Sequence, residues 1–371
     1  TLYHLIFIVK IKNNMRVCIY GSGLSSLSLA HALVNQKIYV DLITTNNFLN
    51  AGKTRTLGIS RSNVLFFNKN IVNIEKLIWK LNKIEIFTEN LKNDKVINFE
   101  DNSEYLFSII KNYKLLELLK KSLFKNNYFK IIKFKKKIFF ENYNLVINTE
   151  NNNFITKKYF SKKIVKKYNS LAYTTVIKHK EISNHVATQI FTKKGPLAFL
   201  PISKNQTSVV YSVHNQVKKE DNDICDLIHY YNFKYKISKI EKIESFRLNA
   251  LSLRSYHYNN ILAFGDLLHR VHPLAGQGFN MTIRDIMYLT KIIKEKKNLG
   301  LPLDKTVCNE FEKNYRNKNY IYSSGIHLIH DFFNFERKIP NNVLSKSLKL
   351  LGQNHLINKF FTKIADKGII F

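Results

Sequence analysis

The sequence predicts a mixed α/β (α+β) protein with a Rossmann-like dinucleotide-binding domain, an inserted domain built on an antiparallel sheet, and a helical C-terminal part. Three observations lead to this prediction: a strand, glycine turn and helix near the N-terminus, a second glycine-rich stretch at residues 261–285, and strand-like segments between residues 185 and 214. With 371 residues and 45% apolar content, the chain can bury a sizeable core. We therefore expect one large or two interlocked globular domains.

The formal net charge is +32, from 59 Lys and Arg against 27 Asp and Glu. So basic a balance ordinarily suggests nucleic acid or an anionic membrane surface as a partner. Here the basic residues are mostly Lys, scattered among Asn, Ile, Phe and Tyr as at residues 125–140, so compositional drift explains most of the charge. We expect no nucleic-acid partner, and a peripheral membrane contact stays open.

The cysteines Cys18, Cys225 and Cys308 are far apart in sequence, which predicts neither a disulfide framework nor a metal site. No run of 18 apolar residues is long enough to span a bilayer, and residues 5–9 are too short for a signal core. We expect a cytoplasmic protein, with contact to the inner membrane as an open alternative. The first methionine directly precedes the first strand, so residues 1–14 are expected to be an extension.

A short apolar strand at residues 15–20 is followed at once by a glycine turn and a helix with apolar residues at helical spacing. Gly21 permits the tight turn, and Gly23 lets the backbone approach a pyrophosphate. The free amides at the helix start, at Leu24 and Ser25, favour its negative charge. This arrangement predicts a dinucleotide site.

Two positions depart from the usual dinucleotide pattern. Ser26 stands where a third glycine is usual, although its small side chain still allows the helix to pack closely on the strand. The second strand, at residues 37–44, should end in an acidic residue that binds the adenosine ribose, but Thr44 stands there. Asp41 lies three residues earlier, and we expect it to face elsewhere.

The stretch at residues 261–285 begins as a buried strand and passes through a proline-glycine loop into a long helix. Asp266, exposed at the strand end, could accept hydrogen bonds from a sugar-like chain, and free amides at the helix start would stabilise an electron-rich ring. His269 and His272 are either general acids or polar residues packed near the cofactor, and we favour packing. The residues expected to bind the cofactor at this helix are Pro273, Gly276, Gln277, Gly278, Phe279 and Asn280.

This stretch resembles FAD-dependent aromatic hydroxylases of the para-hydroxybenzoate hydroxylase fold, whose late motif reads G-D-A-A-H, then P, then G-Q-G-x-N, then D. The segment HPLAGQGFN is particularly similar to the ubiquinone-biosynthesis branch of this family. Leu267 and Leu268 replace the two alanines and would add bulk beside the ribityl chain of the flavin. The matching residues are Gly265, Asp266, His269, Pro273, Gly276, Gln277, Gly278, Asn280 and Asp285.

Other segments match the family in part. Residues 195–202, GPLAFLPI, look like a strand of the substrate-domain sheet that roofs the flavin ring, and Arg55 in TRTLGIS is expected near the flavin or its phosphates. The family's G-A-D-G stretch after the third strand is missing, because Asn148, Thr149, Glu150 and Asn151 stand there. Loss of those glycines would crowd a phosphate, so direct reduction by NAD(P)H is open.

The resemblance implies an FAD-dependent monooxygenase that uses O2 to hydroxylate the aromatic ring of a polyprenylated phenol in ubiquinone biosynthesis. Its reductant, NAD(P)H or a protein electron donor, is undecided, and neither a catalytic residue nor a metal site is identified. Two alternatives stay open: a non-catalytic scaffold of a quinone-biosynthesis assembly, and a flavin-dependent reductase of the same fold.

The expected domain division follows the resemblance. The FAD-binding domain is expected at residues 15–70, 130–165 and 255–300, the substrate domain at 71–129 and 166–254, and a C-terminal helical region at 301–371.

Overall fold

The computed structural model describes residues 15–44, 52–89, 95–100, 105–133, 140–214, 219–272 and 276–336, together with Lys346, Lys363 and Asp366. Two expectations fall outside the described residues. They are the N-terminal extension at residues 1–14 and the cofactor-binding role of Pro273 in the second glycine-rich stretch.

A mostly parallel sheet lies at the centre of the dinucleotide-binding part, in the order β16-β17-β9-β1-β2-β8. Every neighbouring pair is parallel except β16 and β17. The central strands of a parallel sheet are covered on both faces, so their side chains are apolar on both sides and the strands read as continuous apolar runs. The strands are β1 (Arg16–Tyr20), β2 (Tyr39–Thr44), β8 (Phe129–Lys133), β9 (Leu145–Asn148), β16 (His257–Tyr258) and β17 (Ile261–Ala263).

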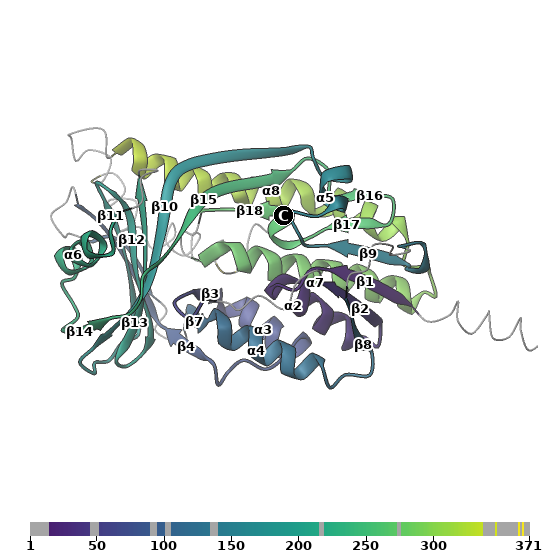
Figure 1. Ribbon diagram of the computed structural model, residues 1–371, viewed down its shortest axis with the longest axis horizontal. Helices are drawn as coiled ribbons and strands as arrows, with labels where there is room; N and C mark the ends of the chain where they lie inside the picture. Colours follow the sequence, from purple (N-terminus) through teal and green to yellow (C-terminus); the bar gives the residue numbers. More distant parts are fainter. Residues whose placement is uncertain are drawn as a thin grey trace, which may run out of the picture.

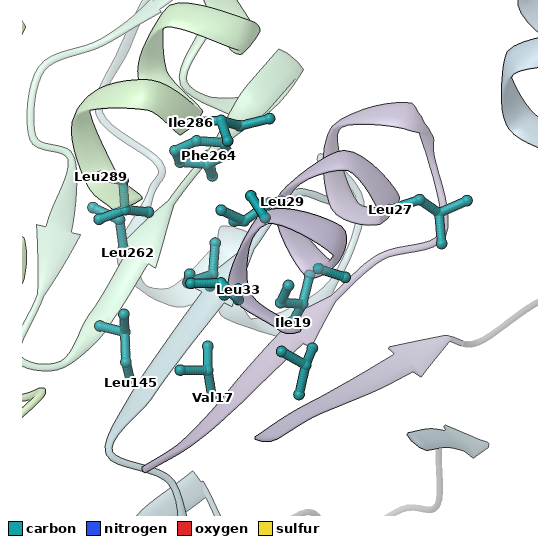
Figure 2. Close-up of a cluster of buried hydrophobic side chains, with 14 of the residues drawn as sticks. Val17, Ile19, Leu27, Leu29, Leu33, Leu145, Leu262, Phe264, Ile286 and Leu289 are labelled. Carbon is teal, nitrogen blue, oxygen red and sulfur yellow. The ribbon is translucent and has the colours of Figure 1, made fainter. Parts of the chain in front are cut away.

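Helix α2 (Leu24–Val34) is apolar on nearly all sides, and every residue from Ser26 to Val34 is buried. It is covered because α4 (Asn112–Leu123) and α7 (Gln277–Asn298) both pack against it. Figure 2 shows the resulting cluster, in which side chains of β1, α2, β9, β17 and α7 meet. Helix α4 lies in the 71–129 stretch expected in the substrate domain, yet its buried leucines belong to this cluster.

A second sheet stands at the other end of the molecule, in the order β18-β15-β10-β13-β12-β11-β5-β6, with β14 on β10 (Figure 1). Helix α6 (Asp221–Tyr231) covers one face of it. The antiparallel strands predicted between residues 185 and 214 are confirmed as β11, β12 and β13. The strands are β5 (Lys83–Thr88), β6 (Lys95–Glu100), β10 (Lys163–His179), β11 (Val186–Thr192), β12 (Gly195–Ser203), β13 (Gln206–His214), β14 (Ile237–Ile240), β15 (Glu244–Leu253) and β18 (His269–Arg270).

A small antiparallel sheet, β3-β7-β4, lies between the two large ones (Figure 1). The Thr56 hydroxyl donates to Ser208 Oγ at 2.9 Å and so ties β3 to β13. The face of the second sheet opposite α6 therefore looks toward the dinucleotide-binding half. The remaining elements nearby are β3 (Thr56–Ser60), β4 (Ile78–Leu81), β7 (Phe107–Lys111), α3 (Arg61–Asn70), α5 (Phe154–Tyr159), η2 (Phe140–Asn142) and η3 (Gly265–Leu267).

The C-terminal part begins with one long helix, α8 (Lys305–Glu336), which packs on α7 and beside β16, β17 and β18. This confirms the amphipathic helix expected after residue 301, as far as the described chain extends. Within the described residues, no helix combines the length and apolar character that crossing a membrane would require.

Candidate functional site

The turn between β1 and α2 is open to solvent where a phosphate would approach. Gly21 has φ +138°, a conformation that favours glycine. Gly23 is the N-cap of α2, no side chain caps the helix there, and its first turn holds no acidic residue. A Cβ on Gly23 would meet nothing within 4 Å, and Gly23, Leu24 and Ser25 are only half-buried. The free amides and the positive helix end are thus accessible to an anion.

The residues that replace G-A-D-G lie against this turn. A Cβ on Gly21 would collide with Thr149 Oγ1 and would lie 3.2 Å from Glu150 Oε1. The Ser26 and Thr149 hydroxyls are hydrogen-bonded at 2.7 Å, so the serine in place of the third glycine and the threonine after β9 support each other. Glu150 brings a carboxylate close to the place where a pyrophosphate would bind.

The end of the second strand behaves as the sequence predicts. Thr44 closes β2. Asp41 is buried, pairs with Arg16 Nε at 2.9 Å and accepts a hydrogen bond from the Tyr143 hydroxyl at 2.8 Å. Asp41 therefore faces away from a ribose.

The Gly265–Asp266 turn lies beside the start of α2. Gly265 has φ +63°, and a Cβ there would lie 2.7 Å from Ser25 Cβ. The Asp266 side chain is exposed at this strand end, as predicted. Leu267 and Leu268 are fully buried in the core cluster. The expectation that they add bulk beside the ribityl chain is wrong, because their side chains point into the core.

The start of α7 is held by one buried amide. Gly276, its N-cap, has φ +64°, and a Cβ there would lie 3.0 Å from Gly58 N. Asn280 Oδ1 accepts from Ser60 N at 2.9 Å and from Asn63 Nδ2 at 2.8 Å. Asn280 Nδ2 donates to Gly58 O at 3.0 Å and to Gly276 O at 3.1 Å. The side chain of Asn280 therefore clamps α7 to β3 and α3.

The other polar and aromatic side chains at the start of α7 also point inward. Gln277 Oε1 accepts from the Tyr322 hydroxyl at 2.6 Å, and Phe279 packs toward Phe67. No side chain caps α7 and its first turn holds no acidic residue, as at α2. A ligand at this end would meet backbone amides, including that of Gly278.

Arg55 is exposed at the start of β3, with its guanidinium 4.3 Å from the centre of the Phe246 ring on β15. It thus lies against the second sheet at β15. The predicted roof strand, β12, packs partly on the small sheet, because Leu200 and Ile202 pack against the cluster that contains Leu81 of β4 and Phe107 of β7.

The two histidines of the late motif are both buried and differ in their partners. His269 Nε2 and Asp285 Oδ2 form a close pair, and Asn319 donates to Asp285 Oδ1 at 2.9 Å. Within the part of the chain that the structure describes, neither ring nitrogen of His272 has a hydrogen-bond partner, and burial lowers its pKa to about 2. The preference for packing over acid catalysis is in keeping with this geometry.

A group of aromatic side chains around His272 was not foreseen. The His272 ring centre lies 4.9 Å from that of Tyr168 on β10 and 4.5 Å from that of His330 on α8. The Tyr168 hydroxyl is hydrogen-bonded to His327 Nδ1 at 2.5 Å. The spacing of His327 and His330, three residues apart on one helix face, was the available signal.

Comparisons with known proteins agree with the resemblance. Residues 166–298 match the family model of the FAD binding domain. The chain is 28% identical over 211 residues to the ubiquinone biosynthesis monooxygenase COQ6, mitochondrial, of Drosophila melanogaster, which covers 46% of this chain and 44% of that protein. It is 26% identical over 171 residues to the 3-demethoxyubiquinol 3-hydroxylase of Escherichia coli, covering 44% and 43%. The chain spans less than half the length of either relative.

Solved structures cover nearly the whole chain. The p-nitrophenol 4-monooxygenase PnpA from Pseudomonas putida DLL-E4 superposes with a TM-score of 0.78 at 10% identity, covering 96% of this chain and 100% of that one. This chain has the fold of the FAD-dependent aromatic monooxygenases. Klebsiella pneumoniae HpxO, complexed with FAD and uric acid, gives a TM-score of 0.73 at 12% identity, covering 95% and 97%. The predicted fold class is confirmed.

The residues of this monooxygenase fold suit FAD. The open backbone at Gly23 and the uncapped α2 start match a pyrophosphate, the exposed Asp266 beside Ser25 matches a polyol chain, and the uncapped start of α7 matches an electron-rich ring. The Glu150 carboxylate is the feature that opposes a phosphate in this arrangement.

Proposed function

We propose that this chain is an FAD-dependent monooxygenase that hydroxylates the aromatic ring of a polyprenylated phenol in ubiquinone biosynthesis. The observation that carries the proposal is the pair of uncapped helix starts on α2 and α7, two helices that pack against each other, with the exposed Asp266 following Gly265, whose Cβ position lies against Ser25 at the start of α2. The names of the COQ6 and 3-demethoxyubiquinol 3-hydroxylase relatives support the substrate class.

The chain's own residues hold the cofactor in this proposal. Amides of Gly23, Leu24 and Ser25 bind the pyrophosphate, and Asp266 accepts hydrogen bonds from the ribityl hydroxyls. Amides at the start of α7, from Gly276 to Asn280, face the flavin ring and stabilise negative charge on it. Arg55, exposed beside Phe246 of β15, offsets phosphate charge in this proposal.

Bound flavin supplies the redox chemistry, because reduced flavin activates O2. One oxygen atom enters the ring C–H bond as a hydroxyl and the other leaves as water. The reductant supplies the two electrons, and the two protons come from NAD(P)H and solvent, or from solvent alone where a protein is the donor. The reductant is NAD(P)H or a protein donor. The protein's share of the work is to position the ring and exclude water, and in this proposal the sheet that contains β12 roofs the pocket.

The finer assignments belong to the same proposal. The FAD-binding, substrate and helical regions follow the boundaries given above, with α4 packed on the dinucleotide-binding part. A membrane-soluble substrate places the enzyme in the cytoplasm at the inner membrane surface, within an assembly of quinone-biosynthesis proteins.

The first test is the visible spectrum of the purified protein, followed by mass identification of what denaturation releases. We expect flavin absorption and released FAD. Oxygen uptake coupled to formation of a hydroxylated prenylphenol then distinguishes a monooxygenase from a reductase of the same fold. The proposal would be contradicted if the purified protein binds FAD but, once its flavin is reduced, never hydroxylates a prenylphenol.

One observation favours a second candidate, a non-catalytic scaffold of the quinone-biosynthesis assembly. Thr149 and Glu150 fill the space beside Gly21 and place a carboxylate there. A colourless protein that cannot be reconstituted with FAD would favour the scaffold. So would rescue of quinone synthesis in a deletion strain by the double variant Asp266→Ala, Gly278→Trp, which should bind no flavin.

A further inference from the structure

The start of α3 lacks the local groups that usually satisfy a helix N-terminus. Its N-cap is Ser60, whose side chain makes no capping hydrogen bond to the helix, and its first turn holds no acidic residue. The helix begins instead with Arg61, a cation at the positive end of the helix dipole. A hydrogen-bond acceptor and a negative charge are therefore needed from outside the helix.

Asp366, in the last part of the sequence, supplies both. Asp366 Oδ1 accepts a hydrogen bond from Ser62 N at 2.8 Å. Asp366 O accepts from Ser62 Oγ at 2.8 Å and from Ser60 Oγ at 2.9 Å. The Ser60 hydroxyl thus donates to Asp366 while the Asp366 carboxylate accepts from an amide of the first turn. This is the reciprocity of a capping box, made here by a residue 304 positions away from Ser62.

Ser60 also links this cap to the start of α7. Ser60 N donates to Asn280 Oδ1 at 2.9 Å, and Asn63 in the first turn of α3 donates to the same oxygen at 2.8 Å. Asn280 Nδ2 in turn donates to the carbonyl of Gly276, the N-cap of α7, at 3.1 Å. Ser60, Asn63 and Asn280 are fully buried, so a displacement at the start of α3 is passed on to α7.

We propose that Asp366 is a positioning residue for the flavin-ring end of the site. By completing the start of α3, Asp366 fixes Ser60 and Asn280 and so sets the direction of the amides at the start of α7. This role rests on the proposed function, because those amides act on a flavin ring only where FAD binds. The link from Asp366 to α7 belongs to the chain itself and is measured without cofactor.

Amide hydrogen exchange of the full chain measures this link. In Asp366→Ala the Ser62 amide loses its side-chain acceptor, so exchange at the starts of both α3 and α7 should quicken by roughly tenfold. Asp366→Asn keeps an oxygen for the Ser62 amide, and asparagine caps a helix as well as aspartate does. Exchange in this variant should stay within about threefold of the wild type.

The matched control is Asp304→Ala. Asp304 is half-buried, and its Oδ1 accepts from Thr306 N at 2.9 Å at the start of α8. The control therefore removes the same kind of cap from a different helix. Thermal stability should fall in both alanine variants, whereas exchange at the start of α7 should quicken only in Asp366→Ala.

The midpoint potential of the flavin is the readout in the FAD-loaded protein, because amides that face the ring stabilise its electron-rich reduced form. In Asp366→Ala the potential should become more negative and FAD affinity should fall by about three- to tenfold. Both quantities should stay near the wild-type values in Asp366→Asn and Asp304→Ala. Should Asp366→Ala fail to fold, Ser62→Ala replaces it, since this change removes one hydroxyl donor to Asp366 O and keeps the amide.

The two readouts separate this role from the proposed function. Unchanged exchange at the start of α7 in Asp366→Ala would overturn the role whether or not FAD binds, and would leave Asp366 a cap of α3 alone. Quickened exchange with unchanged flavin potential and affinity would also overturn it, with the proposed function intact. A wild-type protein that binds no FAD would overturn the proposed function, while quickened α7 exchange in Asp366→Ala would still support the link.

Discussion

The starts of α2 and α7 are alike in their backbone and unlike in what supports them. Each begins at a glycine N-cap without a side-chain cap, and each lacks an acidic residue in its first turn. At α7 one buried amide, Asn280, joins the helix to β3 and α3. At α2 a hydroxyl pair, Ser26 and Thr149, fills the space behind the turn, and Glu150 adds a charge.

The difference indicates which end of the site is rigid and which is adjustable. The α7 start is fixed by several hydrogen bonds of the fully buried Asn280 side chain, so its amides keep one direction. The α2 start is half-buried and its neighbours differ from the family pattern, so its affinity for a phosphate depends on side chains as well as on backbone. Changes at the two ends should therefore differ in kind.

The largest effect is expected from Asn280→Ala. The change leaves the buried amide of Ser60 and carbonyl of Gly58 without a partner, so the free energy of unfolding should fall by about 3–5 kcal/mol. Urea unfolding measures it. The matched change at the other end, Thr149→Ala, removes the Ser26 contact at a half-buried site and should lower the same quantity by about 1 kcal/mol. Similar losses of unfolding free energy in Asn280→Ala and Thr149→Ala would mean that the two helix starts do not differ in rigidity.

His272 belongs to the α7 end, because it lies four residues before Gly276, the N-cap of the helix. Its pKa is lowered to about 2 by burial and by the neighbouring His330, His214 and His327. Below about pH 6.5 the unfolded chain takes up a proton at this residue that the folded chain does not. The free energy of unfolding therefore decreases as the pH is lowered, by up to about 1.4 kcal/mol per pH unit.

Urea unfolding between about pH 7.5 and 5 measures this slope. His272→Gln should reduce this slope by the amount that corresponds to one proton, about 1.4 kcal/mol per pH unit. The free energy of unfolding at neutral pH should change less than the free energy of unfolding at pH 5. The part that persists is expected from His31, whose pKa burial lowers to about 4, and from His327, whose pKa burial also lowers. An unchanged slope in His272→Gln would mean that other groups control the acid sensitivity of this end.

Two glycine substitutions should separate stability from affinity. Gly276→Ala forces an L side chain into a left-handed conformation against Gly58, so the free energy of unfolding should fall by about 1–2 kcal/mol. Gly23→Ala adds a methyl group in open space, so stability should fall by less than about 1 kcal/mol. FAD affinity, measured by flavin fluorescence titration, should nevertheless drop by roughly tenfold in Gly23→Ala, because the methyl group blocks the approach of phosphate. The reverse pattern would contradict the assignment of the two ends.

The fold class and the backbone of both helix starts could be predicted from sequence because their signals are local. A strand, a glycine turn and a helix follow one another within residues 15–34, and the late motif places its glycine at the N-cap of α7. The strand periodicity at residues 186–214 is also local and gave the antiparallel sheet.

The support of the site could not be predicted, because it joins distant parts of the chain. Asn280 and its partners on β3 and α3 are 217 to 222 residues apart, and Ser26 and Thr149 are 123 apart. Leu115 and Leu119 mark the buried face of α4 but carry no information on which helix covers it. Each of these pairings depends on topology that periodicity does not specify.

The smallest change tests whether the α2 end is tuned by charge. Glu150→Gln removes a carboxylate 3.2 Å from the Cβ position of Gly21 and keeps its shape. Because the group is half-exposed, FAD affinity should rise by only about three- to tenfold, and the gain should shrink as salt screens the charge. Glu141→Gln, an exposed glutamate on η2, carries the same charge change and should leave affinity unaltered. A fall in affinity in Glu150→Gln would mean that the carboxylate accepts a hydrogen bond from the cofactor, and the acid that replaces the family's aspartate would then belong to the binding site.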